Sequence, residues 1–149
     1  MDFHQMIPLL LFACFMIAVY IIMKIQLPRI FPEKYKDLKQ KFPSPIKTLE
    51  CVDGRFKGIF IIPISGIMKI DVYPEMLIVS LEGRAILVRY DKNMISGEWG
   101  TIRNYLLIEN IPILSGKSIG KTVKLKVWLY AKDVQFILDL TRNSLVRKA

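Results

Sequence analysis

The chain opens with an uninterrupted apolar run. Every residue from Met6 to Met23 is apolar, and no formally charged side chain occurs between Phe3 and Met23. These 18 residues, with their mostly apolar flanks, suffice to cross about 30 Å of hydrocarbon as a helix. A helix that packs on a core would show a polar stripe, and this run has none. We therefore predict a transmembrane anchor over residues 1–27.

Two processing signals are alternatives to an anchor. A cleaved signal peptide has basic residues before its apolar run and a small-residue cleavage site after it, and this segment has neither. Residues 11–14, Leu-Phe-Ala-Cys, resemble a bacterial lipoprotein cleavage box, but residues 15–23 continue apolar instead of turning polar. We expect no cleavage, and we expect Cys14 to face lipid as a small apolar residue.

A connector rich in lysine and proline is predicted over residues 28–53. Pro28 and Pro32 predict an interruption of the apolar helix, and the pattern predicts a new short helix over residues 33–42. Its apolar face comprises Tyr35, Leu38 and Phe42, and its lysines are Lys34, Lys36, Lys39 and Lys41. Such a helix either lies on an anionic leaflet, which the lysines favour, or packs on the following domain.

The period changes from helical to alternating at Gly54. Alternation and Pro or Gly turn signals predict short antiparallel strands joined as a meander. The predicted strands cover residues 54–62, 67–73, 76–81, 84–90, 103–109 and 122–129. Residues 91–100 are predicted to be a loop that holds a broken strand around Ile95 and Trp99.

Helical spacing returns over residues 131–146. Val134, Ile137, Leu138 and Leu145 share one stripe, which is too broad for a lone helix to bury, so this helix must close one end of the sheet. The predicted fold class is one N-terminal transmembrane helix followed by a mainly antiparallel β domain, residues 54–149, with a C-terminal α-helix.

Several short motifs resemble those of a known group of proteins. They are Tyr35-x-x-Leu38-x-x-x-Phe42-Pro43, then Gly54-Arg55-Phe56, the meander and the closing helix. Over residues 33–142 the chain resembles small uncharacterised bacterial single-span proteins with a pleckstrin-homology-like domain. The resemblance implies binding of phosphoinositides or peptides. The phosphoinositide version needs a basic cluster in the loop between the first two strands, and residues 63–66, Pro-Ile-Ser-Gly, contain no base.

Charge is distributed very unevenly along the chain. Of 149 residues, 52% are hydrophobic, yet the formal net charge is +9. All 22 basic residues lie at or after Lys24, together with 12 of the 13 acidic ones, so this part carries +10. The positive-inside rule then places the N-terminus outside and the domain in the cytoplasm of a bacterium, on its inner membrane. Because topology explains the basic excess, we expect no nucleic-acid partner.

Motifs for catalysis or cofactor binding are weak. Residues 116–122, Gly-Lys-Ser-Ile-Gly-Lys-Thr, suggest a phosphate-binding loop, but the glycine spacing is wrong and a strand pattern follows, so we predict a hairpin loop. His4 is the only histidine, which excludes a Ser-His-Asp set in the domain. Cys51 is interpreted as an inert thiol. We expect no enzymatic activity, cofactor, metal or small-molecule substrate.

The remaining candidate surface is the face of the last predicted strand. Lys124, Lys126 and Trp128 share that face and suit an anionic headgroup or an acidic peptide, although an exposed strand guarded by lysines would look the same. We hypothesise a non-enzymatic binding or scaffold protein, integral to the bilayer, that presents its domain to a membrane or cytoplasmic protein. The alternative is an anionic-lipid-binding module. The candidate contacts are Lys34, Lys36, Lys39, Lys41, Lys124, Lys126 and Trp128.

Overall fold

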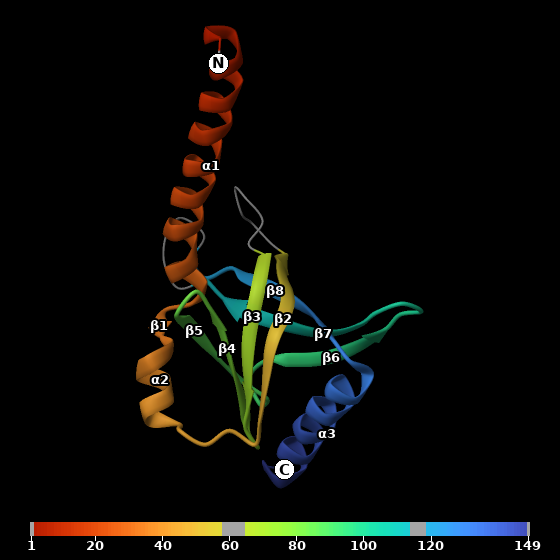
Figure 1. Ribbon diagram of the computed structural model, residues 1–149. Coiled ribbons are helices and arrows are strands. Elements are labelled where there is room, and N and C mark those ends of the chain that lie inside the picture. The colour runs from red at the N-terminus through yellow and green to blue at the C-terminus, as the bar shows by residue number, and fades with distance from the viewer. Residues whose placement is uncertain (1, 58–64, 114–118, 149) are drawn as a thin grey trace.

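The computed structural model describes residues 2–57, 65–113 and 119–148. One long helix, α1 (Phe3–Ile30), stands out from a β domain (Figure 1). It is long and apolar enough to cross a membrane. The predicted interruption at Pro28 is wrong, because α1 continues through this residue to Ile30. A proline in the last turn removes a single amide donor, and burial of the following turn compensates for that loss.

The last turn of α1 belongs to the core of the domain. Leu27, Ile30 and Phe31 are at most 2% exposed. The ring of Phe31 meets that of Phe56 edge-on, with the ring centroids 5.4 Å apart. The helix therefore enters the domain directly, with no flexible linker between them.

The domain is built on one antiparallel sheet of eight strands. They are β1 (Glu33–Lys34), β2 (Lys47–Lys57), β3 (Ser65–Val72), β4 (Met76–Leu81), β5 (Arg84–Arg89), β6 (Met94–Trp99), β7 (Asn104–Pro112) and β8 (Thr122–Leu129). Their order is β1-β5-β4-β3-β2-β8-β7-β6. Two meanders, β2–β5 and β6–β8, are thus joined where β2 pairs with β8, and they cross at a steep angle (Figure 1).

Two strands run further than predicted because each contains a bulge. In β2, Glu50 and Cys51 lie opposite the single residue Lys69, and Cys51 has a φ of 56°. In β7 the register shifts around Asn110, whose φ is 61°. An extra residue interrupts the alternation of side chains, which hides both extensions in the sequence. The predicted strand at residues 54–62 lies partly outside the described residues.

The segment predicted as a loop with a broken strand is a regular strand, β6, that pairs with β7 along its whole length. Its middle residue, Gly97, lies under the C-terminal helix, α3 (Ala131–Lys148). A Cβ atom at Gly97 would lie 3.0 Å from Leu138 and 3.1 Å from Val134. The glycine therefore lets α3 pack closely on β6, and α3 covers the end of the sheet away from α1 (Figure 1).

A short helix, α2 (Tyr35–Lys41), covers the outer face of the β3–β5 part of the sheet. Leu38 of α2 is 2% exposed and packs with Tyr73, Ile78 and Ala85. Of the two alternatives for this helix, the structure shows packing on the domain. Leu38 is thus covered by the sheet, whereas Tyr35 and Phe42 at the two ends of this face are partly exposed.

Candidate functional site

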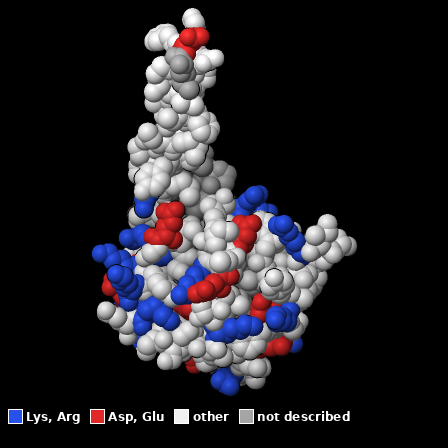
Figure 2. Space-filling model, in the orientation of Figure 1, with Lys and Arg blue, Asp and Glu red and all other residues white. Residues whose placement is uncertain are grey.

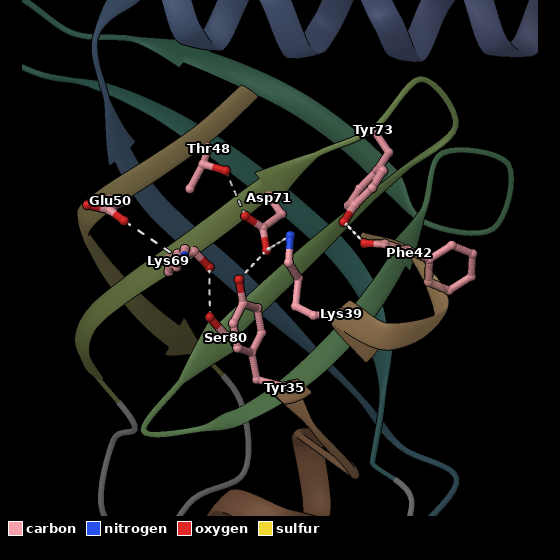
Figure 3. Close-up of polar contacts among 9 residues, drawn as sticks. All are labelled: Tyr35, Lys39, Phe42, Thr48, Glu50, Lys69, Asp71, Tyr73 and Ser80. Atoms are coloured by element: carbon pink, nitrogen blue, oxygen red, sulfur yellow. Dashed lines mark hydrogen bonds and ion pairs between the residues drawn. The ribbon is translucent and has the colours of Figure 1, made fainter. Parts of the chain in front are cut away.

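A buried carboxylate ties α2 to the sheet. Asp71 of β3 is fully buried. Its carboxylate accepts a hydrogen bond of 2.6 Å from the Tyr35 hydroxyl and one of 2.9 Å from the Thr48 hydroxyl. The ammonium group of Lys39 lies 3.8 Å from the same carboxylate. Figure 3 shows the side chains of Tyr35 and Lys39 extending from α2 to Asp71. We call these four residues the Asp71 cluster.

The charges and hydrogen bonds of the Asp71 cluster stabilise the contact between α2 and the sheet. Burial, and secondarily the hydrogen bond to Asp71, raises the pKa of the Tyr35 phenol. A side-chain hydrogen bond with Tyr35 raises the pKa of Lys69, whose ammonium group lies 5.1 Å from the centroid of the Tyr35 ring. Since Asp71 has no exposed surface, the cluster holds α2 on the sheet and is not a substrate site.

Further bonds fix the ends of the segment that carries α2. The side chain of Arg84 donates hydrogen bonds of 2.8 Å to the carbonyls of Phe31 and Pro32. The Tyr73 hydroxyl donates to the carbonyl of Phe42 (Figure 3). The chain from the end of α1 to the end of α2 is thereby held against the sheet along its length.

A candidate binding surface is a groove where β2 and β8 separate. Among the described residues, β2 pairs with β8 only from Gly54 to Lys57. Towards its N-terminal end β2 meets α3 instead, because Lys47 forms a 2.6 Å ion pair with Asp133. The opening between these two contacts has a volume of about 850 Å³. It is lined mainly by residues 48–53, 102–104 and 128–131, and we call it the β2–β8 groove.

The β2–β8 groove combines apolar side chains with a few charges. Ile102 is 91% exposed and Tyr130 is 78% exposed, both at its rim. Glu50 and Asp53 on the β2 side are also exposed. Exposed large apolar side chains beside an interrupted strand pairing are typical of a surface that binds protein.

The seven residues expected from the sequence to make contacts do not form one surface. Lys34, Lys36 and Lys41 are exposed around α2, whereas Lys39 is directed to Asp71. Lys124 lies 3.1 Å from Glu109, and Lys126 lies 3.0 Å from Glu98. Trp128 stacks edge-on against Tyr105, with the ring centroids 5.4 Å apart, and also lines the β2–β8 groove. In Figure 2 basic and acidic side chains are interspersed over the visible face of the domain.

The strand that carries Lys124 and Lys126 is not an edge strand. β8 lies between β2 and β7 in the sheet, so its backbone needs no protection by lysines. The ammonium group of Lys126 lies 4.0 Å from the centroid of the Tyr105 ring, in addition to its ion pair. These interactions occupy both lysines within the protein and reduce the positive charge that they offer to a ligand.

The glycine-rich segment, the acidic residues and the cysteines form no binding site among the described residues. Residues 116–118 of the glycine-rich segment lie outside the described residues, and Thr122 begins the strand β8 and not a helix. Within the described ranges, no three His, Cys, Asp or Glu side chains are grouped so that they could hold a metal ion. Cys51 is a free, exposed thiol.

Comparisons with known proteins add little. No protein-family model and no curated protein matches the sequence. Among solved structures, the chain resembles a chain of "The 8S snRNP Assembly Intermediate", with a TM-score of 0.49 and 8% sequence identity. That match covers 68% of this chain and 85% of the other. Such a distant likeness carries no argument about function.

Proposed function

We propose that the protein is a non-enzymatic binding module anchored in the bacterial inner membrane by α1, with its N-terminus outside and its domain in the cytoplasm. The β2–β8 groove is the site that receives a protein partner. The apolar length of α1 and the absence of basic residues before Lys24 support the anchor and its orientation. The order of a four-strand and a three-strand meander followed by α3 supports a pleckstrin-homology-like architecture.

The observation that carries the partner site is the interrupted pairing of β2. A sheet edge that ends its pairing inside a groove offers backbone donors and acceptors to an extended segment of another chain. Side chains of such a segment would alternate between the groove floor at Leu49 and Val52 and the exposed rim. Ile102 and Tyr130 provide apolar contacts at that rim.

Site-specific photocrosslinking in membranes tests the partner site. Benzoylphenylalanine in place of Tyr130 should form one discrete protein adduct, and the same group in place of Asn143, exposed on α3, should not. In an Ile102→Asp background the adduct at position 130 should disappear, because a buried charge is costly. Ile102 is 91% exposed, so this change leaves the fold intact. Equal adducts at both positions, or an adduct that survives Ile102→Asp, would contradict the groove.

Cysteine labelling tests the orientation. Cys51 is exposed, and replacing Cys14 with serine leaves it as the single thiol. A membrane-impermeant maleimide should label Cys51 only after the cells are permeabilised. Labelling in intact cells would place the domain outside the cytoplasm.

The alternative function, recognition of anionic lipid by the predicted lysines, has less support. Lys124 and Lys126 already pair with glutamates, and Lys39 faces Asp71. Of the lysines predicted to make contacts, those exposed around α2, Lys34, Lys36 and Lys41, remain available to headgroups. Replacing Lys34, Lys36 and Lys41 together with glutamine should therefore leave the amount of protein bound to its partner unchanged.

A further inference from the structure

The end of the domain from which α1 emerges contacts the C-terminal part of that helix. The ammonium group of Lys24 lies 5.4 Å from the centroid of the Tyr20 ring, and such aromatic and basic pairs mark the headgroup level of a spanning helix. The same ammonium group lies 3.8 Å from the carboxylate of Glu82. Glu82 and Gly83 form the β4–β5 turn, both with positive φ. The β4–β5 turn thus reaches the level of Lys24, where the uncharged part of α1 ends.

Ends of three further strands, β2, β3 and β8, lie on this same side of the domain. Figure 1 shows β2 and β3 ending on the side of the domain from which α1 emerges, and Lys57 and Ser65 are their terminal residues. The seven residues between them lie outside the described part and carry no charge in the sequence. Residues 119–121, which lead into β8, also lie at this end because β8 runs antiparallel to β2.

Two large apolar side chains are exposed to solvent on this side of the domain. Ile67 of β3 is 63% exposed, and Ile119 before β8 is 64% exposed. Lys57 and Lys121, close to them in the chain, are exposed as well. Such a pattern suits the surface of a lipid leaflet: the apolar side chains can contact the acyl chains, and the flanking lysines can contact the anionic headgroups. We call these four residues the α1-side rim.

We propose that the α1-side rim is seated in the headgroup region of the leaflet that faces the domain. This contact requires that α1 spans the membrane, as proposed above. The rim and α1 would hold the domain at a fixed tilt, with the β2–β8 groove at a fixed height above the lipid. Ile67 and Ile119 would leave water for the acyl boundary, and the lysines would lie among phosphate groups.

Spin-label accessibility in proteoliposomes tests this contact. The full chain, with both cysteines replaced by serine, receives a single nitroxide-labelled cysteine and is reconstituted with phosphatidylethanolamine and phosphatidylglycerol. Labels replace Ile67, Ile119 or Phe12. The matched control is Ile46, which is 51% exposed and lies beside Val72, at the opposite end of β3. Collision rates with oxygen, which concentrates in lipid, and with a water-soluble nickel chelate are compared.

The expected result is an oxygen-to-nickel ratio at positions 67 and 119 that is severalfold higher than at position 46. A ratio at either rim position equal to that at position 46 overturns the contact. Low collision rates with both reagents would mean that protein covers the rim, and would also overturn it. If position 12 favours nickel, the spanning helix itself is refuted and the contact falls with it. If position 12 favours oxygen while the rim does not, only the contact is refuted.

Discussion

Replacing Tyr35 with phenylalanine removes one hydroxyl group and leaves the ring in place. The lost hydrogen bond is 2.6 Å long and goes to the fully buried carboxylate of Asp71. Hydrogen bonds to charged groups contribute about 1.5–3 kcal/mol. Asp71 keeps the hydroxyl of Thr48 at 2.9 Å and the ammonium group of Lys39 at 3.8 Å. We therefore expect Tyr35→Phe to lower the free energy of unfolding by about 1.5–2 kcal/mol, the lower part of that range.

Urea unfolding of the full chain in detergent micelles measures this change. Both tryptophans, Trp99 and Trp128, lie in the domain and report its unfolding by fluorescence. The matched control is Tyr130→Phe, because Tyr130 is 78% exposed. Its free energy of unfolding should stay within about 0.5 kcal/mol of the wild-type value. If both variants changed stability equally, the bond from Tyr35 would not be what holds α2 on the sheet.

Three further predictions follow from the packing and the buried phenols. Phe31→Ala should lower the free energy of unfolding by about 3–5 kcal/mol in the same urea assay, because it leaves a cavity beside Phe56. Gly97→Val should cost about 1–3 kcal/mol by pushing α3 away from β6, which near-ultraviolet circular dichroism would detect; an unchanged spectrum and stability would contradict that packing. Burial raises the pKa values of Tyr35 and Tyr90, so only the unfolded state releases their protons just above pH 10, and the urea midpoint should fall as the pH rises beyond that value.

Much of the fold could be predicted because its signals are local. The apolar run of α1, the alternation in β4 and the broad stripe of α3 each lie in one continuous segment. Strands with turn residues at both ends were therefore located almost to the residue. The signals failed where the backbone departs from regular geometry, at the bulge of Cys51 and the bulge of Asn110.

The candidate site was harder to predict because it depends on distant contacts. Asp71 alternates with apolar neighbours like any exposed strand residue, and only the docking of α2 buries it. One signal in the sequence points to this contact. The apolar face of the predicted helix has to pack on another element, and the polar face of β3 contains an acceptor for the Tyr35 hydroxyl. The β2–β8 groove had no comparable signal. It arises from the angle at which β2 leaves β8, which no stretch of sequence encodes alone.

The passage of α1 from its apolar part into the core without a break has a consequence for how the chain can vary. An α-helix turns by about 100° and advances about 1.5 Å with each residue. One residue inserted between Lys24 and Gln26 would rotate the whole apolar part of α1 by that angle relative to the domain. A flexible linker between anchor and domain would absorb such a change in length. Here α1 is continuous, so the rotation of its apolar part relative to the domain is fixed by the number of residues between them. Insertions and deletions should therefore be tolerated before α1 and in the hairpin turns, and rejected at this junction.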